Sequence, residues 1–238
     1  PPRSTLFPYT TLFRSLLTIV IILAVVVVLI VPLNLLPYAT RGPKLRAVPW
    51  LYFFCIGVAF MAVEIVLMQK YSLLIGASLY SIVTILLTLL VACGVGSRFS
   101  NRVTDRTAFL FIVGWLLVDA LVFRHLIYAV DTLPLLGRMF VTALLIAPLG
   151  FFMGMPFPKG ALRAGELVDW GFAVNGAASV LGSILVLIAA FTWGFTVALI
   201  LAAVVYSAAY LLLGRQGLWQ QPEAKPPHVE TEPVSTVE

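Results

Sequence analysis

Long apolar runs separated by short polar segments dominate the chain. Each run approaches the roughly twenty residues that a helix needs to cross a bilayer. The first is rich in β-branched residues, but a lone strand in lipid leaves its backbone unpaired, so a helix is expected there too. The pattern predicts an all-α fold, a polytopic integral membrane bundle of about seven transmembrane helices. These expected spans are 16–36, 50–69, 79–96, 108–128, 135–155, 172–191 and 195–214.

Composition strengthens this prediction and excludes several classes of function. Of the 238 residues, 61% are hydrophobic and 11% charged, whereas soluble domains are near half apolar and a quarter charged. The lipid bilayer is therefore an expected partner. The formal net charge of +5 does not indicate nucleic acid, because basic clusters with interleaved aromatic residues are absent. We expect no metal site and no catalytic residue, since P-loop and Ser-His-Asp patterns are also missing from the sequence.

Basic residues predict an orientation. Most Lys and Arg lie in alternate connections, in 37–48, 97–107 and 156–170, and after residue 214. Basic loops face the cytoplasm, so we expect a multi-pass protein of the bacterial inner membrane with a cytoplasmic C-terminus. This orientation puts residue 16 outside. An upstream adenosylmethionine enzyme would be cytoplasmic, so an inverted orientation, further upstream helices or a different upstream domain all stay open.

The two ends differ from the bundle. Residues 5–15 read TLFPYTTLFRS and resemble the translation of a common sequencing adapter, so we treat 1–15 as a leader foreign to the natural protein. We therefore expect the natural chain to continue upstream. The bundle is expected over 16–214. Residues 215–238 are rich in proline and acids and predict a disordered cytoplasmic tail.

Ionisable residues inside the expected spans are the first candidates for function. Glu64 lies well inside span 50–69, where a carboxylate costs a few kcal/mol. It indicates either a cation- or proton-linked site or a carboxyl that locks helices together. Gln69 and Lys70 lie near the expected helix end, where Lys70 can extend toward water. Asp119 is expected to pair with Arg124 or with another helix.

Polar and small residues of the later spans form a second group. Asn175 opens span 172–191 and is expected to hydrogen-bond another helix, with Ser179 one turn on. Small residues four apart suggest close packing between spans 135–155 and 172–191. They include Gly150, Gly154, Gly182 and Ser183. Pro156 and Pro158 are expected to stop the fifth helix, and the interruption could line a cavity, as in transporters.

Three stretches carry a family resemblance. They are 57–97 (GVAFMAVEIVLMQKYSLLIGASLYSIVTILLTLLVACGVGS), 147–160 (APLGFFMGMPFPKG) and 170–195 (WGFAVNGAASVLGSILVLIAAFTWGF). Together they resemble the C-terminal membrane region of bacterial spermidine-synthase-like proteins, in which an aminopropyltransferase- or methyltransferase-like domain is joined to transmembrane helices. The runs 60–65 and 175–182 carry most weight. One departure is Gly76-Ala77-Ser78, where the family tends to have Gly-His-Pro.

The resemblance implies a function outside the bundle. The family's soluble domain would bind S-adenosylmethionine or its decarboxylated form, and nothing in this chain corresponds to its glycine-rich loop. We therefore expect no cofactor here, an upstream catalytic domain of the same protein as a partner, and a bundle that anchors or serves that domain. The alternative is a secondary transporter or channel fragment for a cationic or small polar solute. A purely structural anchor is the third reading; the oligomeric state is left open.

Overall fold

The computed structural model describes residues 45–219 except 77 and 131, together with 17, 18, 21, 22, 24 and 25. For 124–129 and 216 it describes the backbone alone. The expected leader 1–15, most of the expected span 16–36 and the tail from residue 220 lie outside the described residues.

Within residues 45–219, all regular structure is helical. The six long helices are α2 (Ala47–Ile75), α3 (Leu79–Arg98), α4 (Asp105–Val130), α5 (Leu135–Met153), α7 (Val168–Trp193) and α8 (Phe195–Leu213). The short ones are α6 (Pro156–Ala164), η2 (Gly165–Leu167) and η3 (Gln216–Leu218), the last two being 3-10 turns. Gly194, with φ of 88°, makes the tight turn between α7 and α8 that the sequence predicts.

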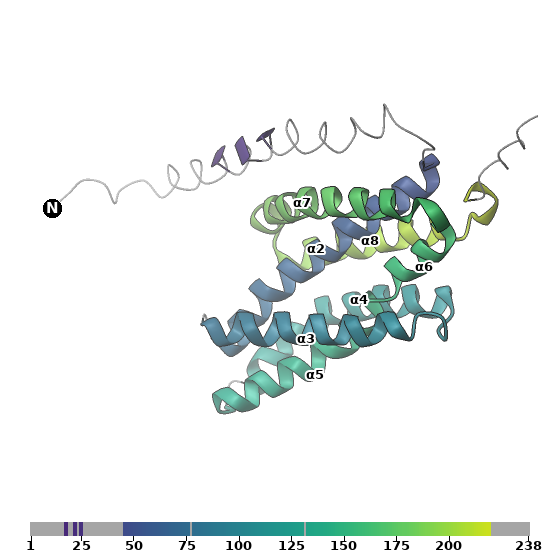
Figure 1. Ribbon diagram of the computed structural model, residues 1–238. Coiled ribbons are helices and arrows are strands. Elements are labelled where there is room, and N and C mark those ends of the chain that lie inside the picture. Colours follow the sequence, from purple (N-terminus) through teal and green to yellow (C-terminus); the bar gives the residue numbers. More distant parts are fainter. Residues whose placement is uncertain are drawn as a thin grey trace, which may run out of the picture.

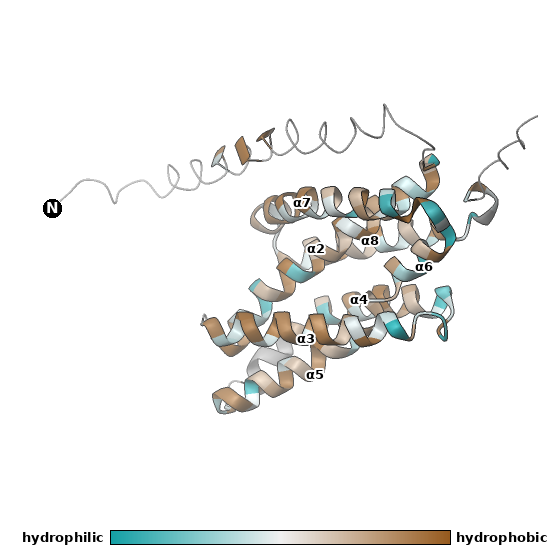
Figure 2. Cartoon of the chain, in the orientation of Figure 1, coloured by the Kyte–Doolittle hydropathy of each residue, from teal (hydrophilic) through white to brown (hydrophobic). Residues whose placement is uncertain are grey.

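Five helical stretches among the described residues are long and apolar enough to cross a membrane. One of them, Leu135–Trp193, includes α5, α6 and α7. The all-helical fold is confirmed, whereas the expected count of seven spans is not. Large apolar side chains are exposed on the outer faces of these helices, and Figure 2 shows apolar colouring along α3 and α5. Such surfaces are consistent with contact with lipid.

Helix α2 is the centre of the bundle. It crosses the other helices obliquely (Figure 1) and packs most extensively against α7 and α8. A second pair, α3 and α5, packs beside it, and α4 connects the two groups through contacts with α8 and α5. Half of the most apolar window of α2 is buried, more than in any other span. Side chains from α2 contribute both to the cavity and to the buried ion pair that are described below.

The predicted packing of the fifth and sixth spans is wrong. Gly150 of α5 and Gly154, which follows the end of α5, lie against α3, where a Cβ added at Gly154 would collide with the Cys93 carbonyl oxygen. Gly182 of α7 lies against Val58 of α2 instead. The glycines do allow close backbone approach, but the sequence spacing does not say which helix approaches.

Several helix ends differ from those expected. α2 continues to Ile75, so Lys70 lies inside a helix and not in a turn. α5 ends at Met153, before the prolines, and Pro156 begins α6. A proline in the first helical turn lacks only an N–H that has no intrahelical partner anyway. The prolines therefore start a helix, where the sequence led us to expect a stop.

The first residues of the predicted tail are ordered. Gln216–Leu218 forms a 3-10 turn, and Trp219 is buried against Tyr52 of α2, with ring centroids 5.2 Å apart. The Trp219 indole N–H donates to the Leu212 carbonyl oxygen at 3.1 Å. Burial of the large apolar surface of Trp219 can hold this short segment in place although most of its neighbouring residues are polar.

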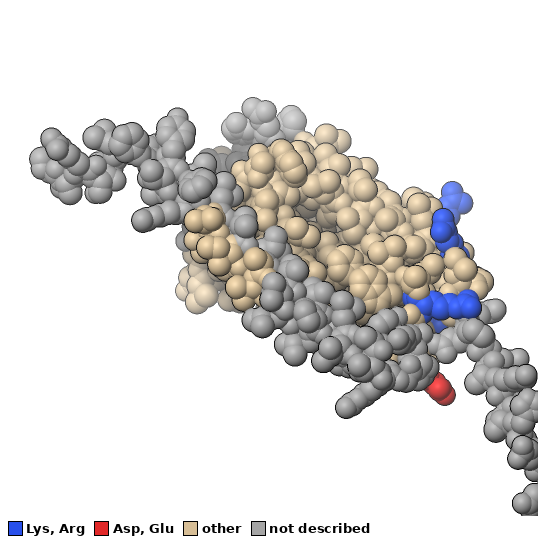
Figure 3. Space-filling model, turned by 90° about the horizontal axis from the view of Figure 1, so that it is seen from above, with Lys and Arg blue, Asp and Glu red and all other residues tan. Residues whose placement is uncertain are grey.

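Charge is concentrated at one end of the bundle. The start of α2, the α3–α4 connection, α6 and the end of α8 meet there (Figure 1), and these segments carry Arg46, Arg98, Arg102, Lys159, Arg163 and Arg215. Figure 3 shows Lys and Arg gathered at this end of the visible face. We call it the basic end. The distribution matches the alternation of basic loops in the sequence.

Candidate functional site: a cavity between α2, α5, α7 and α8

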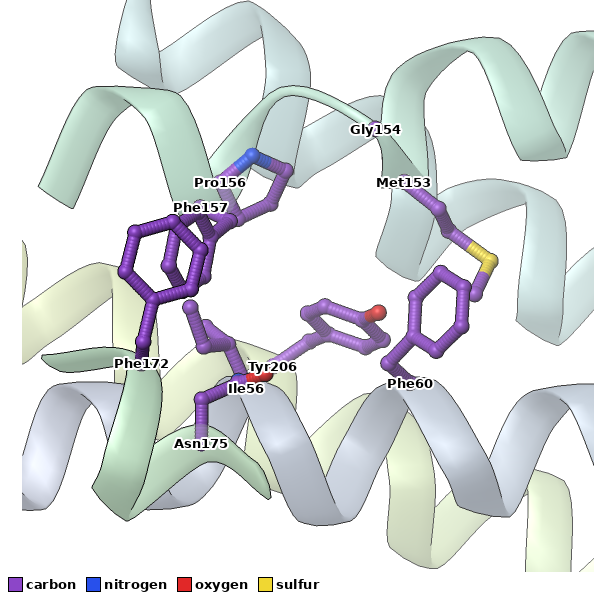
Figure 4. Close-up of a pocket in the computed structure, with 9 residues that line it drawn as sticks. All are labelled: Ile56, Phe60, Met153, Gly154, Pro156, Phe157, Phe172, Asn175 and Tyr206. Atoms are coloured by element: carbon purple, nitrogen blue, oxygen red, sulfur yellow. The ribbon is translucent and has the colours of Figure 1, made fainter. Parts of the chain in front are cut away.

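A cavity of about 280 Å³, open to the surface on one side at the exposed Phe172, lies where α2, α7 and α8 meet the break between α5 and α6 (Figure 4). Most of its wall is apolar or aromatic, and none of its lining side chains is charged. Its lining residues are Ile56, Phe60, Met153, Gly154, Pro156, Phe157, Phe172, Asn175 and Tyr206. A concave, mostly apolar space with a few polar groups is typical of a small-molecule site.

The break between α5 and α6 forms one side of the cavity. Gly154 and Met155 lie between the two helices, and Gly154 and Pro156 both line the space. Tyr52 of α2 fixes this break, because its buried hydroxyl donates to the Pro156 carbonyl oxygen at 2.6 Å. The sequence suggested that an interruption here could line a cavity, and the structure has that arrangement.

Asn175 reaches the cavity from α7. Its Nδ2 donates to the Phe53 carbonyl oxygen of α2 at 3.2 Å, which is an interhelical bond of the kind the sequence predicts. Gly57 makes this approach possible, since a Cβ added there would lie 2.6 Å from the Asn175 carbonyl oxygen. Across the described residues, the side-chain Oδ1 of Asn175 has no hydrogen-bond donor. Asn175 therefore connects two helices and still offers an acceptor.

Tyr206 enters the cavity from α8. Its ring reaches into the space in Figure 4, and the residue is only 1% exposed. No group in the described part of the chain accepts a hydrogen bond from its hydroxyl. The sequence analysis missed Tyr206. One signal was available: tyrosine favours the ends of membrane spans, whereas this one lies in the middle of α8.

Glu64 lies on the same row of α2 as the cavity residues Ile56 and Phe60, one turn beyond Phe60. Residues four apart share a helix face. The side chain is half-buried, and in the region that the structure describes it has neither a hydrogen bond nor an ion pair. Glu64 therefore lies one turn beyond the cavity and is not among the residues that line it.

Lys70 forms a separate buried ion pair. Its Nζ lies 2.6 Å from Asp119 Oδ2 and donates to the Asp119 carbonyl oxygen at 2.8 Å. The Tyr71 hydroxyl donates to Asp119 Oδ1 at 2.6 Å. Phe123 covers the pair, with the ammonium 4.2 Å from its ring centroid. Of the two expected pairings of Asp119, the one with another helix is confirmed, whereas the extension of Lys70 to water is wrong.

The remaining predicted residues have local roles. Ser179 donates to the Asn175 carbonyl oxygen and Ser183 to that of Ser179, each at 2.8 Å and one turn back along α7. Gln69 is half-buried on α2. The structure thus separates the predicted polar residues. Asn175 lies at the cavity, Glu64 beyond it and Lys70 in the ion pair.

A third polar cluster occupies the basic end. Asp105 at the start of α4 contacts Lys159 and Arg163 of α6, and its Oδ1 lies 3.0 Å from Lys159 Nζ. Lys159 Nζ also donates to the Val103 carbonyl oxygen at 2.6 Å. About a third of the Asp105 side chain is exposed. These contacts hold α6 to α4 in reach of water.

No family model, curated protein or solved structure matches the chain.

Proposed function

We propose that this chain is the membrane-embedded domain of a spermidine-synthase-like protein, and that it anchors or serves an upstream catalytic domain of the adenosylmethionine-binding kind. The bundle itself supplies no catalytic residue in this proposal. S-adenosylmethionine or its decarboxylated form would bind the upstream domain.

One observation carries the proposal: the stretches that bear the resemblance contact one another in the structure. Run 60–65 lies on α2 and run 175–182 on α7, the pair with the most extensive contact. Gly57 contacts Asn175, and Gly182 contacts Val58. Stretch 147–160 meets stretch 57–97 where Gly154 touches Cys93. The resemblance therefore lies in the positions that pack the bundle, and it supports a shared packing unit.

The DNA upstream of the codon for Leu16 in the source genome tests the proposal. We expect an in-frame sequence that encodes a strand, a glycine-rich turn and a helix, the pattern of a nucleotide-binding βαβ unit. An upstream frame without that pattern would contradict the proposal, whatever the bundle does by itself.

We also propose a setting for the domain, the bacterial inner membrane with the basic end in the cytoplasm. The segregation of Lys and Arg supports it. The C-terminal segment Gln216–Leu218 then lies on the cytoplasmic side. A green fluorescent protein fused after residue 238 should fluoresce, while alkaline phosphatase at the same place should be inactive. The reverse result would invert the orientation.

A second candidate function, a transporter or channel for a cationic or small polar solute, is favoured by Glu64. A half-buried carboxyl inside a span, without a partner in the described residues, suits a cationic amine. In liposomes, Glu64→Gln should reduce uptake of labelled spermidine or arginine at least tenfold, while Met68→Leu one turn on should not. Equal uptake by wild type and Glu64→Gln for every polyamine and amino acid tried would reject this candidate and leave a structural anchor.

A further inference from the structure

We propose that the cavity between α2, α5, α7 and α8 binds a small uncharged aromatic molecule that carries a carbonyl or carboxamide group. The proposal is independent of the upstream catalytic domain. It rests on the lining of the cavity and on two polar atoms, the Tyr206 hydroxyl and Asn175 Oδ1.

The walls select for an aromatic ring. Phe60 of α2, Phe157 of α6 and Phe172 of α7 come from three different helices and enclose the same space (Figure 4). Phe157 and Phe172 already pack on each other, with ring centroids 4.6 Å apart at a tilt of 45°. Aromatic rings favour such tilted contacts with further rings. A flat ring between these side chains would bury much of its surface, with the exposed Phe172 at the open side of the cavity.

The two polar atoms select for a hydrogen-bonding group. Tyr206 supplies a donor and Asn175 an acceptor, and neither atom has a partner in the described residues. Asn175 is already oriented, because Nδ2 is held by the Phe53 carbonyl oxygen at 3.2 Å. The Tyr206 hydroxyl can therefore donate to an occupant that carries an acceptor, and each such hydrogen bond strengthens binding about fivefold, or by about 1 kcal/mol. A carbonyl oxygen can accept from Tyr206, and an amide N–H can donate to Asn175 Oδ1.

Other occupants fit this lining less well. A cation would lack a counter-charge, since none of the lining side chains is charged. A lipid acyl chain would fill the apolar part and leave the Tyr206 hydroxyl unpaired. Water needs two to four polar partners for each molecule, and a cavity of about 280 Å³ with two free side-chain polar atoms is too apolar to be filled by water alone.

Ligand-observed ¹⁹F NMR on the full chain in detergent micelles tests the proposal, with 4-fluorobenzamide as the probe. The matched apolar probe is 1-ethyl-4-fluorobenzene, which has the ring without the amide. We expect saturable binding of the benzamide and at least fivefold weaker binding of the apolar probe. Tyr206→Phe removes the donor and keeps the ring, and should weaken benzamide binding about fivefold, the effect of one net hydrogen bond.

Two further variants complete the design. Tyr210→Phe makes the same chemical change one turn along α8, at a residue that packs on Phe109 and does not line the cavity, and should bind like wild type. Phe60→Trp should block the cavity and abolish binding even if Tyr206→Phe fails to fold. The proposal would be overturned if 4-fluorobenzamide associated with protein-containing micelles no more than with empty micelles. So would equal affinity of wild type, Tyr206→Phe and Phe60→Trp.

Discussion

Two of the polar groupings in the described part of the bundle differ in how their hydrogen bonds are satisfied. At the Lys70–Asp119 pair, 3% and 8% exposed, the ammonium, both carboxylate oxygens and the Tyr71 hydroxyl all have partners. At the cavity, the Tyr206 hydroxyl and Asn175 Oδ1 have none within the described part of the chain. Both groupings use α2 together with helices distant from it in sequence.

The difference distinguishes a structural contact from a candidate binding site. A fully satisfied pair inside a membrane protein ties helices together and has no capacity left for a ligand. A polar group that lacks a hydrogen-bond partner and lies beside a cavity can still bind a ligand, at some cost in stability. Glu64, the most prominent residue in the sequence, belongs to neither grouping, although it shares the cavity-facing row of α2.

The largest expected effect comes from breaking the ion pair on one side. Asp119→Ala leaves Lys70 buried without its counter-charge, and should lower the free energy of unfolding by about 3–5 kcal/mol. Unfolding by SDS in mixed micelles measures this. The double variant Lys70→Met/Asp119→Leu removes both charges and should recover most of the loss. A double variant less stable than Asp119→Ala would contradict the interpretation that the loss comes from leaving Lys70 without its counter-charge.

A smaller loss is expected from Gly57→Ala, on the cavity side. The added Cβ would lie 2.6 Å from the Asn175 carbonyl oxygen and 3.0 Å from Ala178 Cβ, so α2 and α7 must separate. Overpacking of this kind costs about 1–3 kcal/mol. Gly176→Ala is the matched control, because its Cβ would meet nothing within 4 Å. The same assay should show the control at wild-type stability or above, and equal losses would contradict the described helix contact.

A pair of Tyr→Phe variants tests the comparison directly. Tyr71→Phe removes a hydrogen bond to a buried carboxylate, and should cost about 0.5–2 kcal/mol. Tyr206→Phe removes a hydroxyl without a described partner, and should leave the free energy of unfolding unchanged or raise it. Thermal unfolding in one detergent suffices, since the two changes are chemically identical. Equal destabilisation by both would remove the distinction between the two groupings.

The smallest effect is expected at the basic end. Arg163→Gln breaks one contact with Asp105 where both side chains are partly exposed, and should cost less than about 1 kcal/mol. The loss should shrink further as salt rises, because screening weakens exposed pairs first. Asp119→Ala should keep its loss at high salt. Unfolding at low and high ionic strength would reveal whether the two clusters differ as described.

The sequence by itself determined the helical class, the presence of helices apolar enough to cross a membrane and most helix positions, because apolar length and composition act locally along the chain. It also singled out Asn175 and the interruption near Pro156, since a polar residue or a broken helix is conspicuous in an apolar run. The order of the segments along the chain also predicts that the basic loops lie together at one end of the bundle.

Only the tertiary structure decided which helices meet. Gly154 packs on α3 and Gly182 on α2. The sequence could not predict either contact, because a small residue permits the close approach of any helix. Lys70 is paired, whereas Tyr206 has no partner among the described residues, because each outcome depends on what another helix brings within about 3 Å. Those contacts join residues 49 positions apart or more, and no local pattern in the chain encodes such a distance.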